Sequence, residues 1–314
     1  MEPVRLGVVG LGRMGRHHVR CASLAAGVEL VGAHDVDAAR ASSTDARFFS
    51  ELDTLLAGCE ALVLAVPTDR HGEVARRALA AGCHLLVEKP LAAGVVECAA
   101  MRDAAREAGR VLAVGHVERW NGAWAPVAER LVEPRFVEGH RLAAFDPRGT
   151  EVDVVMDLMI HDLDLLLAMF GAEPTRVEAV GVAVLTDRVD IASARLEFPG
   201  GGLANLTASR VSREPVRKLR IFQQDAYFSL DLATGSAEIF ARDASSPFGV
   251  TRQNTEPPAG HNPLVRELEE FAKAVRGRPN ESIDPDHATR AVALAERVLG
   301  SIAERRSIWA APSS

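Results

Sequence analysis

The chain has few cysteines, no long apolar run and no cluster of basic residues. Its four cysteines, Cys21, Cys59, Cys83 and Cys98, are scattered without the CxxC or Cys/His spacing of a zinc site. We therefore expect buried, reduced thiols and no bound metal. No stretch approaches the roughly 18 apolar residues of a membrane-spanning helix, and the N-terminus has no basic flank before a long apolar segment. These absences predict a cytoplasmic protein with no membrane partner.

The charge balance excludes another class of partner. The 36 Lys and Arg residues are outnumbered by 43 Asp and Glu residues, which gives a formal net charge of −7. Such a chain is not expected to bind nucleic acid. With 47% hydrophobic and 25% charged residues, the composition also excludes the disordered, collagen-like and coiled-coil classes. Its 314 residues provide material for about two domains.

The first part of the chain alternates short apolar runs with amphipathic segments. The apolar runs are RLGVVG, VELVGAHD, ALVLAVP, HLLVEK and RVLAVGH. Helix-like stretches such as HGEVARRALAAG and AAGVVECAAMRDAAREAG lie between them. This alternation predicts βαβ units on a doubly wound parallel sheet, in a domain covering residues 1–118.

From about residue 136 the hydrophobic period changes to two. The runs DIASARLEF, GGLANLTASR, VRKLRIFQ and AYFSLDLAT read as strands with one apolar and one polar face, and PGGG joins the first two as a hairpin turn. Residues 119–314 are therefore expected to form an α/β domain with a mostly antiparallel sheet. Asn262-Pro263 and Asp284-Pro285 fit an N-cap followed by a first-turn proline in two closing helices.

The motif VVGLGRMG contains Gly10, Gly12 and Gly15 as G-x-G-x-x-G, after a predicted strand and at the start of a predicted helix. Glycine at these points allows a tight turn and lets the backbone approach a pyrophosphate at the helix N-terminus. The second strand ends in AHD, which places Asp35 to bind an adenosine ribose. A carboxylate there would repel the 2′-phosphate of NADP, so NAD is the expected cofactor.

The stretch LLVEKPLAAG places two opposite charges and a proline directly after an apolar strand. In a doubly wound sheet, ligands bind beyond the carboxyl ends of the strands. Lys89 would therefore point its ammonium into the crevice where a nicotinamide lies, and Pro90 biases Lys89 away from helical geometry. The segment VPTDRH follows the preceding strand at the same edge. A solvated surface loop is the alternative interpretation of Glu88 and Lys89.

The stretch EVDVVMDLMIHDLDLLLAMFG has helical periodicity and is apolar around most of its circumference. Asp157, His161 and Asp164 recur at i, i+4 and i+7, so a helix would align them in one stripe. Buried acids and a buried histidine require partners or a cavity. A satisfied core histidine is the alternative for His161, but a nearby nucleotide site favours a functional role.

Together, VVGLGRMG, VPTDRH, EKPLA, DLMIHDLDLLL and PLVRELEEFAKAV resemble, in this order, the Gfo/Idh/MocA family of NAD(P)-dependent sugar and polyol oxidoreductases. The resemblance implies a Rossmann domain joined to an α/β domain whose large open sheet mediates homodimers or homotetramers. It implies that Lys89, Asp157 and His161 form the catalytic set. The residues predicted to contact the cofactor are Gly10, Gly12, Arg13, Met14, Gly15, Asp35, Pro67, Thr68, His71 and Glu88.

VGHVERWNGAW and DPRGTEVDVVMDLMIHD are similar to family members that oxidise the 3-hydroxyl of UDP-N-acetylglucosamine. Those members typically read GH-x-ERFNP, so this chain departs from them at Trp120 and Gly122. We predict substrate or nicotinamide contacts for Glu118, Arg119, Asn121 and Arg148, with ordinary loop polarity as the alternative.

The predicted reaction oxidises a secondary sugar hydroxyl to a ketone, with hydride transfer to the nicotinamide. His161 would accept the hydroxyl proton, because the unperturbed pKa of histidine is about 6.5. Asp157 would hold its ring and Lys89 would stabilise the alkoxide, although Lys89 and His161 could exchange roles. One other function is dehydrogenation of a free sugar or a cyclitol such as inositol. A non-catalytic NAD-sensing regulator is the second, and the joint presence of the three catalytic residues argues against it.

Overall fold

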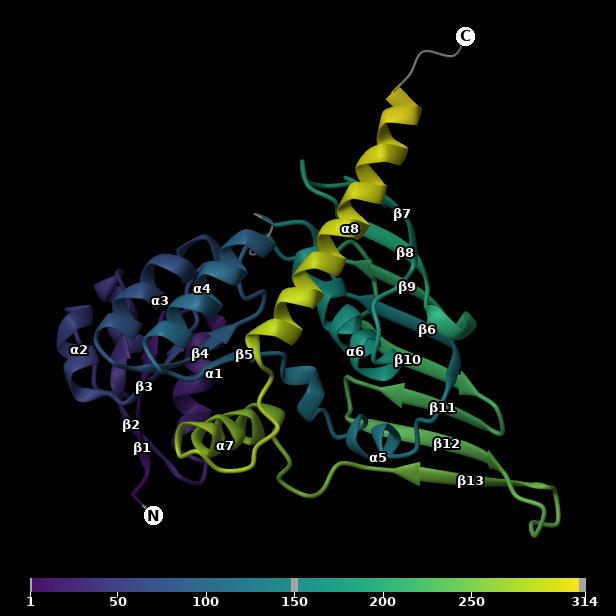
Figure 1. Ribbon diagram of the computed structural model, residues 1–314, viewed down its shortest axis with the longest axis horizontal. Coiled ribbons are helices and arrows are strands. Elements are labelled where there is room, and N and C mark those ends of the chain that lie inside the picture. Colours follow the sequence, from purple (N-terminus) through teal and green to yellow (C-terminus); the bar gives the residue numbers. More distant parts are fainter. Residues whose placement is uncertain (1, 148–151, 311–314) are drawn as a thin grey trace. The chain divides into compact units, whose positions relative to one another are not determined.

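The computed structural model describes residues 2–147 and 152–310, with side chains as far as residue 308. The chain divides into two compact units, coloured along the sequence in Figure 1. The first unit comprises the chain up to Val117 together with Asn262–Val292, and the second comprises Glu118–His261 and the chain from Ala293 onward. The segment Asn262–Val292 thus packs with the first unit, although the sequence-based division at residues 118 and 119 assigns it to the second domain.

The first unit is built on a five-stranded parallel sheet in the order β2-β1-β3-β4-β5. The strands are β1 (Val4–Val9), β2 (Val28–His34), β3 (Ala61–Leu64), β4 (His84–Glu88) and β5 (Leu112–Gly115). The connecting helices are α1 (Arg13–Ala22), α2 (Leu52–Gly58), α3 (His71–Ala80) and α4 (Val95–Glu107), joined by α7 (Pro263–Val275). All five apolar runs are strands, which confirms the predicted doubly wound Rossmann sheet.

Helices cover both faces of this sheet because its strands are apolar on both sides. Val4, Leu6 and Val8 of β1 belong to the core that includes Leu268 and Phe271 of α7. On the other face the backbone of β1 closely approaches the side chains of α2 and β3. Figure 1 shows α3 and α4 on one side of the sheet and α1 and α7 on the other.

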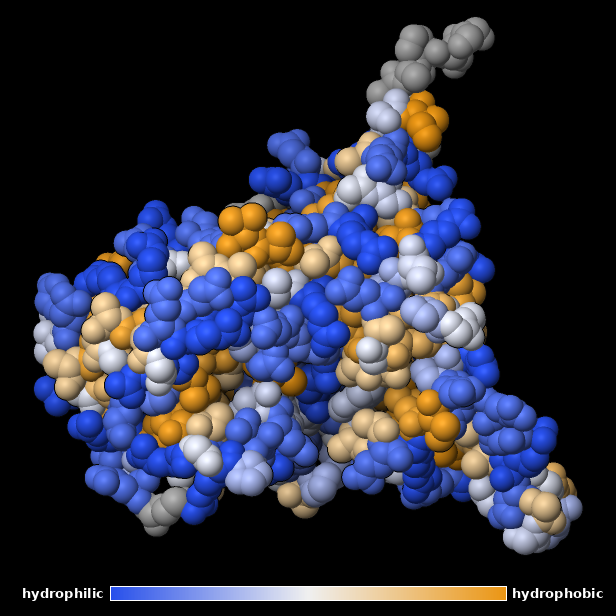
Figure 2. Space-filling view, in the orientation of Figure 1, coloured by the Kyte–Doolittle hydropathy of each residue, from blue (hydrophilic) through white to orange (hydrophobic). Residues whose placement is uncertain are grey.

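The outward surface of α3 carries charged side chains, including Glu73, Arg76 and Arg77. Figure 2 shows a mainly hydrophilic surface over α3 and α4, as amphipathic helices packed on a sheet require. Among the helices of the described segments, none is long and apolar enough to cross a membrane.

The second unit contains an eight-stranded sheet in the order β13-β12-β11-β10-β6-β9-β8-β7. Its strands are β6 (Pro134–Leu142), β7 (Arg176–Val182), β8 (Ile191–Glu197), β9 (Leu203–Ser209), β10 (Val216–Gln223), β11 (Ala226–Asp231), β12 (Ser236–Arg242) and β13 (Val250–Thr255). Neighbouring strands are antiparallel except for the β6–β9 pair, which is parallel. The predicted mostly antiparallel sheet is confirmed.

One face of this sheet is covered by α6 (Ile160–Phe170), as Figure 1 shows. Buried Val137, Gly139 and Arg141 of β6 alternate with partly exposed Phe136 and Glu138. Because side chains alternate across a strand, the two sets lie on opposite faces of the sheet. The remaining helices of the second unit are α5 (Ala125–Ala128) and the part of α8 (Pro285–Ala310) that begins at Ala293.

The segment before α6 is not the regular helix that the periodicity predicts. Residues Val155–Met159 form a π-helical turn, and the α-helix begins at Ile160. Asp157 lies in the wider turn, and Asp164 is fully buried whereas Asp157 and His161 are partly exposed. The single stripe expected from an i, i+4, i+7 spacing is therefore divided between two helix geometries. Such π turns often occur at functional sites.

The two predicted helix starts are confirmed by their capping contacts. The Asn262 side chain accepts hydrogen bonds from the backbone N–H groups of Leu264 and Val265 at the start of α7. At the start of α8, Asp284 accepts one from His287 N at 2.8 Å. These bonds satisfy donors that lack intrahelical partners.

Candidate functional site

The motifs of the first unit share one edge of the parallel sheet. Gly10 follows β1, Asp35 follows β2, and Pro67 lies just after β3. Glu88 is the last residue of β4, and Lys89 comes directly after it. Because the strands are parallel, their carboxyl ends lie at the same edge, where doubly wound folds bind ligands. The strand order reverses between β1 and β3, so Gly10 stands at the switch point.

The glycine turn fits a closely approaching diphosphate. Gly10 has φ +92°, and a Cβ there would lie 2.5 Å from the carbonyl oxygen of Ala65. A Cβ on Gly15 would lie 1.7 Å from the carbonyl oxygen of Gly10. Gly12, at the N-cap of α1, has no such crowding and leaves the start of the helix open. Gly10 and Gly15 therefore shape the turn, and Gly12 leaves room for a ligand at the positive end of the helix dipole.

Asp35 is buried beside this turn and its orientation is fixed by the backbone. Its Oδ2 accepts a hydrogen bond from Leu11 N at 2.6 Å, and its Oδ1 accepts one from Asp37 N at 2.9 Å. The side chain is thus held between the end of β2 and the glycine turn, at the position that a ribose-binding acid occupies in a Rossmann fold.

The other predicted cofactor residues occupy three kinds of environment. Arg13 is exposed and Met14 half-buried in the first turn of α1, where Met14 packs on the apolar core. Pro67 is exposed, and Thr68 begins the short helix η2 (Thr68–Arg70). His71 is buried, with Nδ1 3.1 Å from Leu91 O and Nε2 3.1 Å from Val66 O. The His71 ring therefore holds the loops after β3 and β4 together.

Glu88 is the centre of a buried polar cluster. His18 Nε2 on α1 donates a hydrogen bond to Glu88 Oε1 at 2.6 Å. Burial raises the pKa of Glu88, but this hydrogen bond and the charges of His18, Lys89 and His71 outweigh burial and hold the pKa below its ordinary value. Glu88 is therefore an anion at neutral pH.

Glu267 of α7 is a second buried carboxyl of the same unit. Within the described segments, neither of its oxygens has a hydrogen-bond partner. Burial, and next the negative charge of Glu88, raise the pKa of Glu267 well above its ordinary value. The pKa values of the two carboxyls are thus shifted in opposite directions, that of Glu88 downward and that of Glu267 upward.

The predicted catalytic residues are distributed over the two units. Lys89 lies in the first unit and is half-buried at the dinucleotide edge of the sheet. Asp157 and His161 lie in the second unit, on the π-helical turn and in the first turn of α6. All three residues are partly exposed.

Glu118, Arg119 and Asn121, predicted to contact substrate, make extensive contacts inside the second unit. Glu118 accepts hydrogen bonds from Arg141 Nη1 at 2.7 Å and from Asn121 Nδ2 at 2.9 Å. Arg119 Nε donates to Asp164 Oδ2 at 2.6 Å, on the helix that carries His161. These contacts tie η3 (Val117–Trp120) to α6. Arg148 lies outside the described residues.

Arg141 completes a buried ionic cluster under α6. It contacts Glu118 and, through Nη2 and Nε, both oxygens of Asp162 at 2.7 and 3.1 Å. Burial lowers the pKa of Arg141, but the two carboxylates outweigh burial and raise it above its ordinary value. Burial raises the pKa of Asp162 despite the opposing charge of Arg141. The cluster fixes the rotation of α6 against the sheet.

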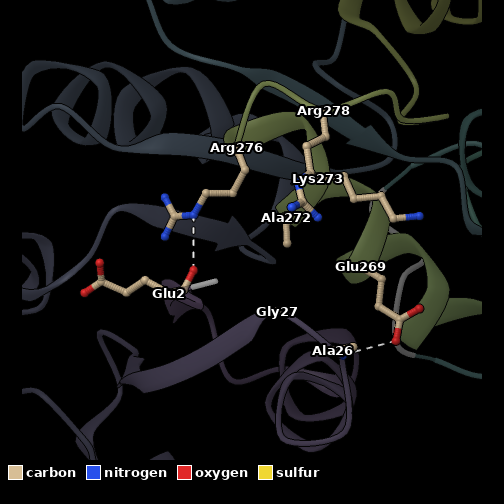
Figure 3. A pocket seen from close by; sticks show the side chains of 8 residues that line it. All are labelled: Glu2, Ala26, Gly27, Glu269, Ala272, Lys273, Arg276 and Arg278. Atoms are coloured by element: carbon tan, nitrogen blue, oxygen red, sulfur yellow. Dashed lines mark hydrogen bonds between the residues drawn. The ribbon is translucent and has the colours of Figure 1, made fainter.

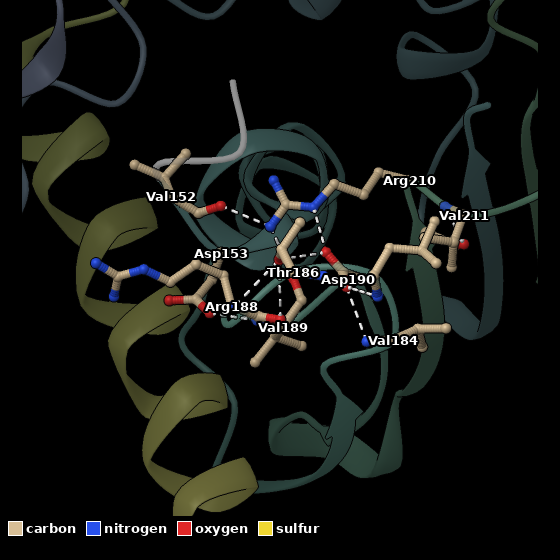
Figure 4. Close-up of polar contacts among 11 residues, drawn as sticks. Val152, Asp153, Val184, Thr186, Arg188, Val189, Asp190, Arg210 and Val211 are labelled. Atoms are coloured by element: carbon tan, nitrogen blue, oxygen red, sulfur yellow. Dashed lines mark hydrogen bonds and ion pairs between the residues drawn. The ribbon is translucent and has the colours of Figure 1, made fainter. Parts of the chain in front are cut away.

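A second cluster fixes the chain just before the π-helical turn (Figure 4). Asp190 accepts hydrogen bonds from the backbone N–H groups of Val184, Leu185 and Thr186 and from Arg210 Nε. Burial raises the pKa of Asp190, but these hydrogen bonds outweigh burial and hold the pKa far below its ordinary value.

The same cluster reaches the segment that leads into Asp157. Arg210 Nη2 donates to Val152 O at 2.7 Å, and Asp153 accepts from Val189 N at 2.7 Å. Val154 N donates to Val189 O at 2.9 Å. The residues preceding Asp157 are therefore anchored to Val189, just before β8, and to Arg210, just after β9.

A hollow of about 360 Å³ lies at the other edge of the first unit (Figure 3). Its lining includes Glu2, just before β1, and Gly27, just before β2. Ala26 N donates to Glu269 of α7 at 3.1 Å on its rim. Because it opens at the amino ends of the strands, this hollow is separate from the dinucleotide edge. In the described parts of the chain, no group of three or more His, Cys, Asp or Glu side chains is placed to hold a metal ion.

Sequence reasoning missed the supporting charges of both units. The sequence motifs indicate no role for His18, Arg141, Asp190, Arg210 or Glu267. Charged residues inside apolar runs, such as Glu267 in PLVRELEEF, are the only local signal. Their partners are distant in sequence, so the pairing itself is visible only in three dimensions.

Comparisons with known proteins place these features in one family. Residues 4–116 match the oxidoreductase family with an NAD-binding Rossmann fold, and residues 130–229 match the GFO/IDH/MocA C-terminal domain. The chain is 40% identical over 305 residues to the UDP-N-acetylglucosamine 3-dehydrogenase of Acidithiobacillus ferrooxidans, covering 95% of this chain and 97% of that protein. A solved structure of that enzyme has a TM-score of 0.88 and 39% identity, covering 96% of this chain and 98% of that chain.

A more distant relative acts on a cyclitol. The inositol 2-dehydrogenase of Rhizobium meliloti is 26% identical over 335 aligned positions, covering 97% of this chain and 98% of that protein. Both relatives match the chain across both of its units. This full-length match is consistent with the glycine turn, the buried Asp35 and the two sheets of the structure. The chain therefore belongs to the Gfo/Idh/MocA family of oxidoreductases, and its residues 4–116 match the NAD-binding Rossmann fold of that family.

Proposed function

We propose that the protein is an NAD-dependent dehydrogenase that oxidises the 3-hydroxyl of UDP-N-acetylglucosamine or a closely related nucleotide sugar. The observation that carries this proposal is the 40% identity to a UDP-N-acetylglucosamine 3-dehydrogenase over 95% of the chain. The identity to an inositol 2-dehydrogenase over a similar span is 26%. A nucleotide sugar is therefore the favoured substrate class.

The residues at the dinucleotide edge fit NAD. The crowded Gly10 and Gly15 form a turn that only glycine can occupy, and open Gly12 lets a pyrophosphate approach the N-terminus of α1. Asp35 is positioned to bind the ribose, and its negative charge favours NAD over NADP. When bound, the nicotinamide supplies the hydride acceptor for oxidation of the carbinol carbon.

Residues of the chain itself would accept the hydroxyl proton of the substrate and stabilise the charge of the alkoxide. We assign His161 as the base that accepts the hydroxyl proton, because imidazole is suited to proton transfer near neutral pH. Asp157, in the π-helical turn just before His161, would orient the ring, and the Lys89 ammonium would stabilise the developing alkoxide. Lys89 directly follows Glu88, and its positive charge is one of the causes that hold the pKa of Glu88 below its ordinary value.

Glu118, Arg119 and Asn121 lie in the second unit, as do Asp157 and His161. Glu118 contacts Arg141 of β6 and Arg119 contacts Asp164 of α6, so both elements hold η3. Partly exposed Arg119 is the member of this group that we expect to contact the nucleotide sugar, because a guanidinium matches the oxygens of a diphosphate.

A screen for reduced nicotinamide tests the function. UDP-N-acetylglucosamine, other UDP-sugars, free hexoses and cyclitols are each incubated with the protein and NAD, and absorbance of the reduced cofactor is followed. The proposal expects turnover with UDP-N-acetylglucosamine and little with the free sugar that lacks the diphosphate. Turnover with inositol alone would support the cyclitol alternative, and full-length folded protein that turns over no substrate in the panel would contradict the proposal.

We also propose that the protein is a homo-oligomer, a homodimer or a homotetramer, assembled through the face of the eight-stranded sheet opposite α6. That face carries an aromatic row defined by Phe136, Phe222, Tyr227 and Phe240. Consecutive ring centroids are 5.6, 4.7 and 5.7 Å apart, and the Arg252 guanidinium lies over the last ring. A row of half-buried aromatic side chains is typical of an interface between subunits. The cytoplasmic location is a prediction from the sequence.

A further inference from the structure

The Asp35 carboxylate has a cationic neighbour that the glycine motif does not reveal. Asp37 caps the short helix η1 (Ala38–Ser43) by accepting a hydrogen bond from Ala39 N at 3.1 Å. This turn brings the chain back toward the end of β2, so that Arg40 Nη1 lies 3.7 Å from Asp35 Oδ2. Arg40 Nε lies 3.5 Å from Asp37 Oδ2. The guanidinium is therefore placed between two carboxylates.

Arg40 also reaches the glycine turn. Its Nη1 lies 3.6 Å from the point that a Cβ on Gly12 would occupy. The same nitrogen thus faces both Gly12, where the backbone is open to a pyrophosphate, and Asp35, which is positioned for the ribose. The Arg40 side chain is 47% exposed, whereas that of Asp35 is 8% exposed. The cation is the accessible member of the pair.

The two charges have opposite effects on a 2′-phosphate. Asp35 cannot turn away from the ribose, because both of its oxygens accept backbone hydrogen bonds. The half-exposed Arg40 side chain is held by ion pairs at 3.5 to 3.7 Å, and a guanidinium can also donate a fork of N–H groups to a phosphate. A cation within 4 Å of Asp35 also offsets part of the carboxylate's repulsion of a second anion.

We propose that Arg40 is a specificity-determining residue of the dinucleotide site and allows NADP to bind alongside NAD. This inference rests on the proposed function, since it assumes that the glycine turn and Asp35 bind a dinucleotide. Asp35 favours NAD, and Arg40 limits that preference by contacting the 2′-phosphate of NADP. NAD carries no such phosphate, so its affinity depends little on Arg40.

Calorimetric titration of the full-length protein with NAD and with NADP tests the inference without a turnover assay. Arg40→Met keeps the aliphatic stem and removes the charge. We expect it to weaken NADP binding about tenfold or more and to change NAD binding by less than about threefold. Arg40→Lys keeps the charge but loses the planar fork of guanidinium N–H donors, so an intermediate NADP affinity is expected.

Two matched variants complete the design. Arg76→Met removes an exposed arginine of α3 in the same unit and should leave both affinities unchanged. Asp35→Asn should strengthen NADP binding relative to NAD, and adding Arg40→Met to it should reverse that gain. Thermal unfolding of each variant checks that the fold is intact, which we expect because the Arg40 side chain is half exposed.

The outcomes separate this inference from the proposed function. Equal changes for NAD and NADP in Arg40→Met, or no change in either, would overturn the role of Arg40 while leaving the dehydrogenase assignment intact. Failure of the folded wild-type protein to bind either dinucleotide would overturn both.

Discussion

His18 Nε2 donates a hydrogen bond of 2.6 Å to Glu88 Oε1, and both side chains are buried. His18 lies on α1, three residues after the last glycine of the turn, and Glu88 directly precedes Lys89. The bond therefore joins the helix that would hold the pyrophosphate to the strand end that presents the proposed catalytic lysine. Two motifs 70 residues apart are coupled by one buried pair.

Removing this pair should destabilise the fold. His18→Leu leaves the Glu88 carboxylate buried without its donor, and we expect a loss of about 3–5 kcal/mol in the free energy of unfolding. His17→Leu is the matched control, since His17 contacts Arg20 near the surface, and it should cost less than about 0.5 kcal/mol. Urea denaturation of the two variants measures the difference. Equal losses would show that His18 and Glu88 are not energetically coupled.

Glu267 should make stability fall as the pH rises. Its pKa is raised in the folded chain, so above the ordinary value of 4.5 the folded state holds a proton that the unfolded chain releases. The contribution of Glu267 to the free energy of unfolding is complete below that pH. It is lost progressively as the pH rises toward the folded pKa, by up to about 1.4 kcal/mol per pH unit. Glu267→Gln has no proton to release, so it should be more stable than wild type at mildly alkaline pH and show a smaller slope.

Urea denaturation at mildly acidic and mildly alkaline pH measures this slope. Glu269→Gln, on the partly exposed side of the same helix, is the control and should keep the wild-type slope. A Glu267→Gln variant with the wild-type pH dependence would show that Glu267 is not the titrating group.

Two glycines of one turn should respond differently to alanine. A Cβ on Gly15 would lie 1.7 Å from Gly10 O, so Gly15→Ala must displace α1 and should cost about 1–3 kcal/mol or more of stability. A Cβ on Gly12 meets only Arg40 Nη1 at 3.6 Å, an ordinary contact. Gly12→Ala should therefore fold normally but lose NAD affinity, because the methyl group blocks the approach of the pyrophosphate. Thermal unfolding and NAD calorimetry separate the two effects, and normal NAD binding by Gly12→Ala would place the pyrophosphate elsewhere.

The catalytic assignment predicts large losses of turnover with NAD binding retained. Lys89→Ala should lower kcat about 10²-fold or more through lost charge stabilisation. His161→Ala should lower it about 10²- to 10⁴-fold through lost proton transfer. The double variant should lose less than the product of the two, because residues acting on one transition state are not additive.

Steady-state kinetics on the best substrate of the screen measure these losses. Arg76→Ala, which removes an exposed cation of α3, is the control and should keep wild-type kcat. A near-wild-type kcat in His161→Ala would move the role of base to Lys89. Unchanged turnover in all variants would remove the catalytic assignment of both motifs.

The aromatic row predicts how assembly can be disrupted. Phe222 stacks on both Phe136 and Tyr227, so Phe222→Asp places a charge at the middle of the proposed interface. We expect its mass in light scattering to fall to that of the monomer at micromolar concentration. Thr251→Asp adds a charge to exposed β13 at a position next to Arg252, on the other face of the strand, and should keep the wild-type mass. A wild-type protein that is already monomeric would contradict the proposed assembly.

Local patterns in the sequence determined the five strands of the parallel sheet, four strands of the second sheet and the order of the motifs. Alternating apolar runs and amphipathic segments define the parallel sheet, because burial on both faces demands continuous apolar strands. The glycine spacing, the acid after β2 and the lysine after β4 follow from the chain order, since parallel strands bring their carboxyl ends to one edge. The periodicity of two likewise predicts the second sheet.

Only the tertiary structure decided which charges meet. Glu88 binds His18 across 70 residues, Arg141 joins Glu118 to Asp162, and Arg210 joins Asp190 to Val152 O. It also decided that Asn262–Val292 packs with the first unit and that Asp157 lies in a π-helical turn. Such pairings depend on burial and distance in the folded chain, because desolvation makes a charge require a partner wherever the fold places one. A sequence pattern records only neighbours along the chain, so it can indicate that a residue is charged but cannot identify the group that will compensate it.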